Sequence, residues 1–134
     1  ADRELRTIFR DVQDVEREYF SRTGIYPINH TVVMRRELLD DFPDAPAAIF
    51  AAYCNGKKRA LARRIGSTFV PWGKEYWTET MATFGGDPFP MGLTESNRKN
   101  VGTLLRYLHE QKLISTLPDI EDLFLPGTAN FVEG

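Results

Sequence analysis

The sequence lacks the features of several protein classes. Its one cysteine, Cys54, allows neither an internal disulfide nor a multi-cysteine metal site, and is most simply a small buried side chain in a reducing cytoplasm. Uncharged runs such as 65–73 are far shorter than the roughly 20 apolar residues that span a bilayer. Lysine plus arginine number 17 and aspartate plus glutamate 19, so no broad basic face favours nucleic acid. We therefore expect a cytoplasmic protein without membrane or nucleic-acid partners.

Short motifs for metals and cofactors are also missing. The two histidines, His30 and His109, have no second ligand at the spacing of an HxxxH, HxH or CxxC pair. The sequence contains no glycine-rich phosphate loop and no nucleophile elbow. It therefore predicts neither a self-contained metal site nor a cofactor.

Most of the chain has the pattern of helices. Hydrophobic residues make up 42% of the sequence, enough for the core of one ordinary domain, and most recur at helical spacing. Start and stop signals predict a helix that begins after Asp11 and stops at Gly24, a short helix at 35–42, and a long helix from Asp44 to Gly66. They also predict a helix that ends at Gly85, a helix that begins after Thr94, and a last helical turn in 119–126. The side chains expected in the core include Trp72, Tyr76, Trp77, Val101, Leu104, Leu105 and Leu108.

One segment has the pattern of a strand. Residues 25–34 are rich in β-branched side chains, with Pro27 at the beginning or on an edge, and 67–72 form a weaker candidate. Two strands cannot form a stable sheet alone, because three or more strands, or a covering helix, are usually needed. The missing strands then come from a larger α/β protein of which this is the C-terminal part, or from a second copy. The start at Ala1, without an initiator methionine, favours a processed or partial chain.

His30 is the first candidate for chemistry. It shares a strand face with Ile28, Val32 and Met34, while Asn29 points the other way. It is either a core histidine bonded to backbone or an acid or base facing a cleft, since histidine exchanges protons near neutral pH. The strand pattern leaves both readings open.

The second candidate is "GLTESNRKN" at 92–100, where Thr94, Glu95, Asn97, Arg98 and Asn100 crowd the start of a helix. The positive end of a helix suits an anion, and Arg98 could hold a carboxylate with two hydrogen bonds. Ordinary capping explains the same residues, with Thr94 as the cap and Arg98 paired with Glu95. The basic run "KKRALARR" at 57–64 is interpreted as a solvated helix face.

The order of these motifs resembles a known family. "EREYFSRTGIYPINHTVVMRREL", a helix after "FPDAP", "FPMGLTESNRKNVGTLLRYLHEQKLI" and "IEDLFLPGT" are similar to the C-terminal portion of the 4,5-dihydroxyphthalate decarboxylase family. The most specific pieces are "TGIYPINH" and "GLTESNR". The resemblance runs from about Phe9 to Thr128 and is weakest in 65–90.

The resemblance implies a fold. It implies an α/β, two-lobed architecture like the type 2 periplasmic binding proteins, of which this chain is the mostly helical C-terminal part with one confident strand. Residues 1–24 would end the second lobe, and 25–134 would supply a crossover strand and helices that cover the first lobe. The remaining N-terminal half of the same protein is then the main partner.

The resemblance also implies a reaction, the decarboxylation of 4,5-dihydroxyphthalate, or a related hydroxylated aromatic acid, to protocatechuate and carbon dioxide. On that reading His30 transfers a proton, and Asn29, Asn97, Arg98 and Glu95 bind the small aromatic carboxylate. The alternative is a periplasmic solute-binding protein that delivers a small organic anion to an ABC importer without catalysis. A third reading is an interaction module that forms a homo-oligomer by strand pairing.

Overall fold

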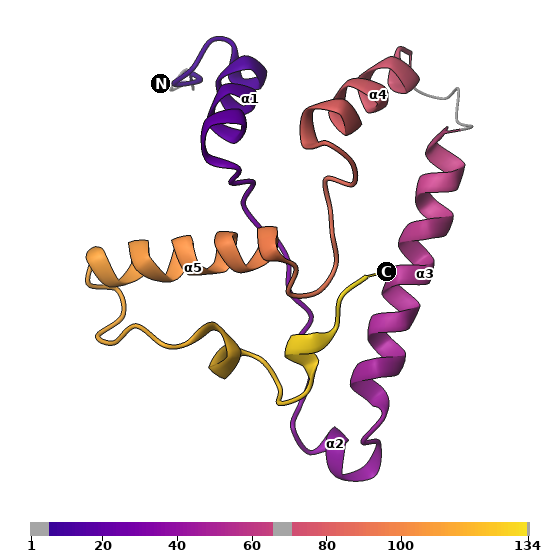
Figure 1. Cartoon of the computed structure of the whole chain (residues 1–134), viewed down its shortest axis with the longest axis vertical. Coiled ribbons are helices and arrows are strands. Elements are labelled where there is room, and N and C mark those ends of the chain that lie inside the picture. Colours follow the sequence, from indigo (N-terminus) through magenta and orange to yellow (C-terminus); the bar gives the residue numbers. More distant parts are fainter. Residues whose placement is uncertain (1–5, 66–70, 134) are drawn as a thin grey trace, which may run out of the picture.

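Helices dominate the computed structural model, which describes residues 6–65 and 71–133 (Figure 1). The expected helices are found, although the one predicted over 35–42 is limited to Leu38–Asp41 and the last turn is a 3-10 turn. The helices within these residues are α1 (Val12–Thr23), α2 (Leu38–Asp41), α3 (Ala45–Ile65), α4 (Gly73–Phe84) and α5 (Glu95–Glu110), with short 3-10 turns η1 (Ile120–Leu123) and η2 (Thr128–Asn130). In the described part of the chain, no helix combines the length and the apolar character needed to cross a membrane.

The helix ends follow the signals in the sequence. Gly24 after α1 and Gly85 after α4 adopt the left-handed conformation, with φ of 63° and 68°. Glycine reaches this conformation without steric cost, so it stops a helix efficiently. Thr94 caps α5, because its hydroxyl accepts a hydrogen bond from the Asn97 N–H at 3.2 Å. Asp11 precedes α1 as expected, but its side chain makes no capping hydrogen bond.

The predicted strand at 25–34 is not found as a strand. This part of the chain is irregular backbone without a ladder partner, because no described segment lies in register beside it. Over residues 6–65 and 71–133, β structure is limited to an isolated antiparallel bridge between Gly92 and Val132. The second candidate, 67–72, lies mostly outside the described residues, and its last two residues, Pro71 and Trp72, form a turn.

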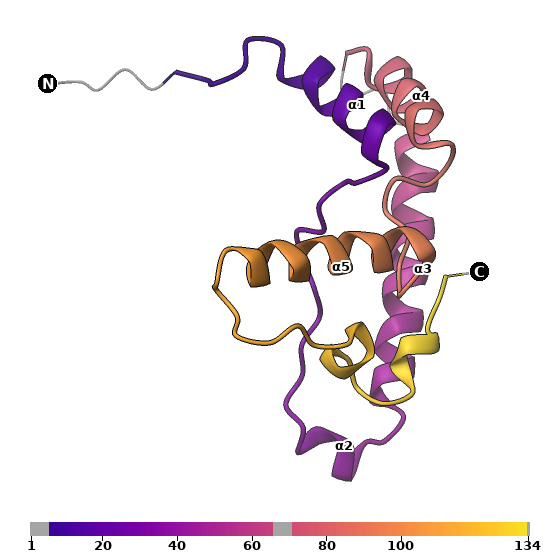
Figure 2. The ribbon, with the colours of Figure 1, turned by 60° about the vertical axis from the view of Figure 1, so that its left-hand side comes forward.

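The helices are arranged openly (Figures 1 and 2). The longest helix, α3, runs along one side of the molecule, α5 lies crosswise to it, and α2 is at the end away from α1 and α4. α1 packs on α4, where the rings of Phe20 and Phe84 are 4.3 Å apart and Arg17 pairs with Glu79 at 2.8 Å. The C-terminal tail returns to α3 (Figure 1).

The apolar core is small for a chain of this length. Among the described residues, the buried hydrophobic side chains are Cys54, Leu93 and Leu105. The prediction for Cys54 is confirmed. The prediction that Trp72, Tyr76 and Leu104 lie in the core is wrong, because their side chains are mostly exposed. A domain of about 130 residues normally buries about two thirds of its surface, so these helices leave much apolar surface uncovered.

Candidate functional site

The site predicted from the sequence divides into two parts. Asn29 and His30 lie on the irregular segment between α1 and α2, and both are exposed. Neither side chain has a hydrogen bond or ion pair with any described residue, so nothing in that part of the molecule holds the His30 ring in one orientation. The reading of His30 as a core histidine bonded to backbone does not hold within the described residues.

The other predicted residues lie at the start of α5. Asn97 donates from Nδ2 to the carbonyl oxygens of Pro90 and Gly92, at 2.7 Å each. Both of its amide hydrogens are thus committed to the loop before the helix. Glu95 is exposed in the first turn. Thr94 caps the helix as expected, so ordinary capping explains this half of the motif.

Arg98 is also engaged within the chain. Its Nη1 pairs with Glu121 of η1, and Nη2 lies 3.4 Å from the carbonyl oxygen of Ala129. The expected pairing with Glu95 is therefore wrong. The Arg98 guanidinium lowers the pKa of the Glu121 carboxyl, chiefly by hydrogen bonding to its charged form. To hold a substrate carboxylate, Arg98 would have to exchange Glu121 for it.

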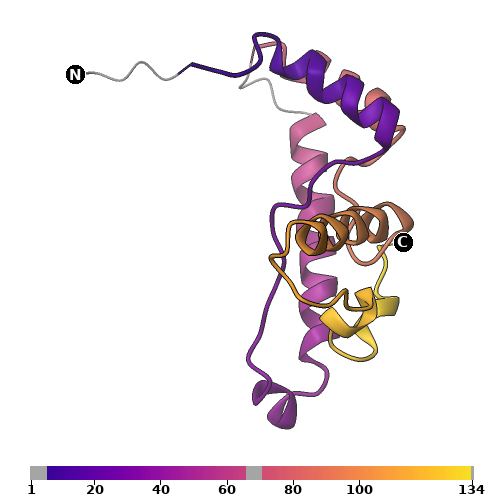
Figure 3. The ribbon, with the colours of Figure 1, turned by 90° about the vertical axis from the view of Figure 1, so that its left-hand side faces the viewer.

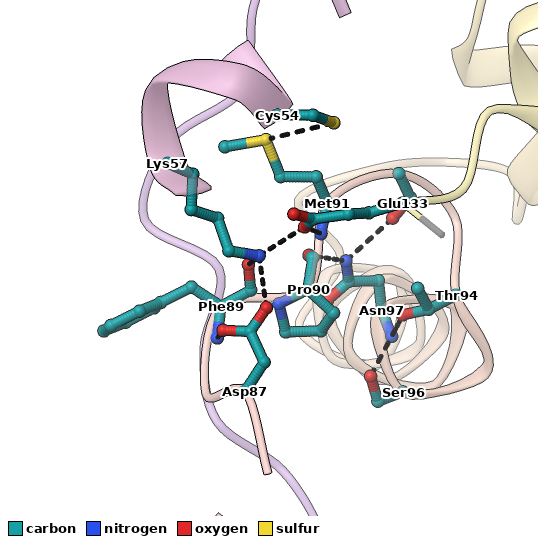
Figure 4. Close-up of polar contacts among 11 residues, drawn as sticks. Cys54, Lys57, Asp87, Phe89, Pro90, Met91, Thr94, Ser96, Asn97 and Glu133 are labelled. Atoms are coloured by element: carbon teal, nitrogen blue, oxygen red, sulfur yellow. Dashed lines mark hydrogen bonds and ion pairs between the residues drawn. The ribbon is translucent and has the colours of Figure 1, made fainter. Parts of the chain in front are cut away.

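The most buried charge in the described residues is Lys57, which the sequence placed on a solvated face (Figure 4). Its side chain is 9% exposed, and its ammonium bonds to Asp87, to Glu133 and to the carbonyl oxygen of Phe89 at 2.7 Å. Burial by itself lowers the pKa of Lys57, but the hydrogen bonds to Asp87 and Glu133 outweigh it and raise the pKa above 10.5.

A signal in the sequence could have identified Lys57. It lies three residues after Cys54 on α3, and residues three apart share a helix face. The buried face that carries Cys54 therefore also carries Lys57. The Cys54 sulfur lies 4.0 Å from the Met91 sulfur, which places Met91 above this face (Figure 4). The exposed neighbours Lys58, Arg59 and Arg63 fit the predicted solvated face.

Lys57 joins three distant parts of the chain at what we call the Lys57 junction: Lys57, Asp87, Phe89, Gly92 and Glu133. Two backbone hydrogen bonds hold the C-terminal tail there. The Leu93 N–H donates to the Phe131 carbonyl oxygen at 3.3 Å, and the Glu133 N–H donates to the Met91 carbonyl oxygen at 3.2 Å. Gly92 has φ of 86°, and a Cβ there would lie 1.8 Å from the Phe131 carbonyl oxygen. Only glycine therefore permits this close approach.

The chemical character of this junction is structural. Two carboxylates and a carbonyl occupy the Lys57 ammonium, which leaves no donor free for an anion. In residues 6–65 and 71–133, no group of three or more histidine, cysteine, aspartate or glutamate side chains is arranged to hold a metal ion. Of the residues predicted for the site, Asn29, His30 and Glu95 have side chains that make no hydrogen bond or ion pair with the described part of the chain.

Comparison with known proteins adds one relationship. No family model matches the chain. The chain is similar to 4,5-dihydroxyphthalate decarboxylase of Comamonas testosteroni, with 26% identity over 129 residues. The match covers 93% of this chain and 39% of that protein, so the chain spans about two fifths of its relative's length. This similarity suggests a relationship to that decarboxylase.

Proposed function

We propose that this chain is part of a carboxy-lyase that removes a carboxyl group from 4,5-dihydroxyphthalate or a related hydroxylated aromatic acid. The observation that carries the proposal is the similarity to a 4,5-dihydroxyphthalate decarboxylase over 93% of the chain. It includes both the His30 segment and the start of α5, the two places where polar residues gather. The rest of the cleft comes from the larger part of the protein that this chain does not correspond to.

The chemistry requires a proton at carbon. Each carboxyl of the substrate is para to a ring hydroxyl, and loss of the hydroxyl proton pushes electrons to the carbon that bears the carboxylate. That carbon takes up a proton, the bond to the carboxylate carbon breaks, and carbon dioxide leaves as the ring regains its aromaticity. His30 is proposed to supply this proton, because it is exposed and its ring nitrogens are uncommitted within the described residues. Asn29 and Glu95 are proposed to contact the substrate beside it.

The proposal is tested by product formation. The full-length protein is incubated with 4,5-dihydroxyphthalate, and carbon dioxide and protocatechuate are measured together; they should appear in equal amounts. Phthalate, which has no hydroxyl groups, should give neither product. If the protein binds the acid and releases it unchanged, the activity is refuted and the solute-binding alternative is favoured.

The two histidines form a matched pair for the role of His30. His30→Gln should abolish turnover while substrate still binds, and His109→Gln, in the last turn of α5, should leave turnover unchanged. Equal turnover in the two variants would remove His30 from the mechanism.

Arg98 is proposed to grip the substrate's second carboxylate in exchange for Glu121, while Asn97, whose amide hydrogens are committed to Pro90 and Gly92, holds the loop beside it. A second pair of variants tests Arg98. Arg98→Lys keeps the charge but loses the planar fork, so the Michaelis constant should rise more than kcat falls. Glu121→Gln weakens the partner that Arg98 must exchange, and should leave the Michaelis constant unchanged or lower it. If Glu121→Gln raises the Michaelis constant as much as Arg98→Lys does, then Arg98 acts only by holding η1.

A further inference from the structure

Residues 26–34 form a stretch of chain whose backbone is unpaired. None of their N–H or C=O groups has a hydrogen bond with the described residues. The stretch is nevertheless fixed at both ends: the Ile25 N–H bonds to Thr23 Oγ1 at 3.1 Å, and the Arg35 carbonyl accepts from Leu38 at 3.2 Å. Exposed backbone groups can bond to water, but burying them unpaired costs free energy, so any element that covers this stretch would have to supply partners.

Apolar side chains lie on both faces of this stretch toward its two ends, and the polar residues Asn29, His30 and Thr31 lie between them. Ile28 and Val32 share one face of an extended chain and are 42% and 58% exposed, while Val33 points the opposite way and is 88% exposed. A strand with one face in water alternates apolar and polar residues, whereas a strand covered on both faces has a continuous apolar run. The run Val32, Val33 and Met34 therefore has the pattern of an interior strand.

The described chain supplies only part of the cover. Gly24, just before the stretch, lies against Lys99 of α5, since a Cβ on Gly24 would be 3.2 Å from Lys99 Nζ. The stretch then passes beside α5, and Figure 3 shows no described element on its other side. One face thus has a helix near it, and the opposite face and both strand edges are open.

The chain's relative indicates what lies on these open sides. The match covers 39% of that protein, so more than half of the relative's length has no counterpart here. We propose that residues 26–34 are an interior strand of a sheet whose neighbouring strands come from the remainder of the same polypeptide. This rests on the proposed function only in taking the longer decarboxylase as a guide to the length of the protein.

A second copy of the chain fits this surface less well. Pairing around a twofold axis brings one edge of the stretch against the same edge of its partner. The other edge, and the apolar face away from α5, would stay in water. Neighbours from the remainder of the protein can pair with both edges and also cover that face, which is what the apolar side chains on both faces require.

Amide hydrogen exchange on the full-length protein tests the pairing. If the stretch is an interior strand, the amides of residues 28–34 should all exchange about 1,000-fold or more slowly than in a free peptide, because a folded domain exposes paired amides only in rare openings. Protection of alternate amides would show an edge strand and overturn the interior assignment. Peptide-like exchange throughout would overturn the proposal.

Two adjacent variants give an independent test. The N–H groups of Val32 and Val33 point to opposite edges, so Val32→Pro and Val33→Pro should each lower the thermal midpoint of the full-length protein. A lower thermal midpoint in only one of the two variants would show an edge strand. The 134-residue chain should be a monomer by sedimentation with fast exchange in 28–34, and a dimer with protected amides would make the second copy the occupant.

These outcomes are separate from those for the reaction. Protected amides in a protein that releases no carbon dioxide would keep the sheet and reject the decarboxylase. Carbon dioxide release by a protein whose amides are unprotected would keep the decarboxylase and reject the sheet.

Discussion

Replacing Lys57 with methionine is the sharpest test of the Lys57 junction. Methionine keeps an apolar stem of similar length at this position of α3 and removes the ammonium. Glu133 and Asp87 are then left facing each other without a cation, with side chains 13% and 33% exposed. The variant should therefore destabilise the protein by leaving two carboxylates and the Phe89 carbonyl without their shared donor.

The size of the effect follows from the burial of the three groups. Removing one partner of a buried ion pair costs about 3–5 kcal/mol, and a hydrogen bond to a charged group contributes about 1.5–3 kcal/mol. Asp87 is exposed enough to regain water, whereas Glu133 is not, which favours the lower part of that range. We expect a loss of about 3 kcal/mol, or a shift of about 2 M in the urea midpoint for a slope of about 1.5 kcal/mol/M.

The pH dependence has a definite direction. Because the pKa of Lys57 is raised above 10.5 in the folded protein, the contribution of the ammonium is complete below pH 10.5 and is lost as the pH rises through the folded pKa. The difference between wild type and Lys57→Met should be constant from pH 7 to about 10 and then shrink.

Urea denaturation of both proteins, read by circular dichroism, measures the difference. The control is Lys74→Met, which removes an exposed lysine of α4 and should cost less than about 0.5 kcal/mol. A loss of that size for Lys57→Met as well would mean that the two ion pairs behave as solvated surface pairs. The reasoning from burial would then be refuted.

Two further predictions concern the tail and η1. Gly92→Ala should lower the free energy of unfolding by about 2–3 kcal/mol and speed amide exchange at Leu93 and Glu133, because the new Cβ displaces the Phe131 carbonyl. The control is Gly102→Ala in α5, where the new Cβ would lie 3.6 Å from Ile120 Cδ1. This control should raise the free energy of unfolding by up to about 1 kcal/mol. Equal stability of the two alanine variants would contradict the close approach at Gly92. The pKa of Glu121 should lie below 4.5 in an NMR titration and return toward 4.5 in Arg98→Met, so the Arg98–Glu121 pair contributes above pH 4.5 and is lost as the pH falls through the folded pKa. A midpoint unchanged by Arg98→Met would assign the shift to another cause.

The helices were predictable because their signals are local. Apolar spacing, a threonine cap and glycines at the ends act within one or two turns, so Thr94, Gly24 and Gly85 could be read directly from the sequence. The strand at 25–34 was predicted from composition alone, and a strand exists only if another backbone lies beside it. That condition depends on residues far away, which local pattern does not contain.

Burial was harder to predict for the same reason. Tyr76 of α4 and Leu104 of α5 were expected in the core, yet each is exposed because no described element covers that side of its helix. Lys57 shows the opposite failure, since its charge suggested solvent while carboxylates 30 and 76 residues away enclose it. The types of residues predict which side chains share a helix face, but contacts with residues far along the chain determine which face is buried.

The polar residues of "GLTESNRKN" show how a motif can be both structural and functional. Gly92, Thr94 and Asn97 fix the loop before α5, and Arg98 fixes η1 after it, so four of these residues are accounted for by the fold. Because they set the position and direction of α5, they also set where Glu95 stands relative to the strand-like segment that carries His30. Substitutions at Gly92 or Asn97 should therefore lower stability and turnover together, whereas substitution of His30, which has no hydrogen bond or ion pair with the described residues, should lower turnover more than stability.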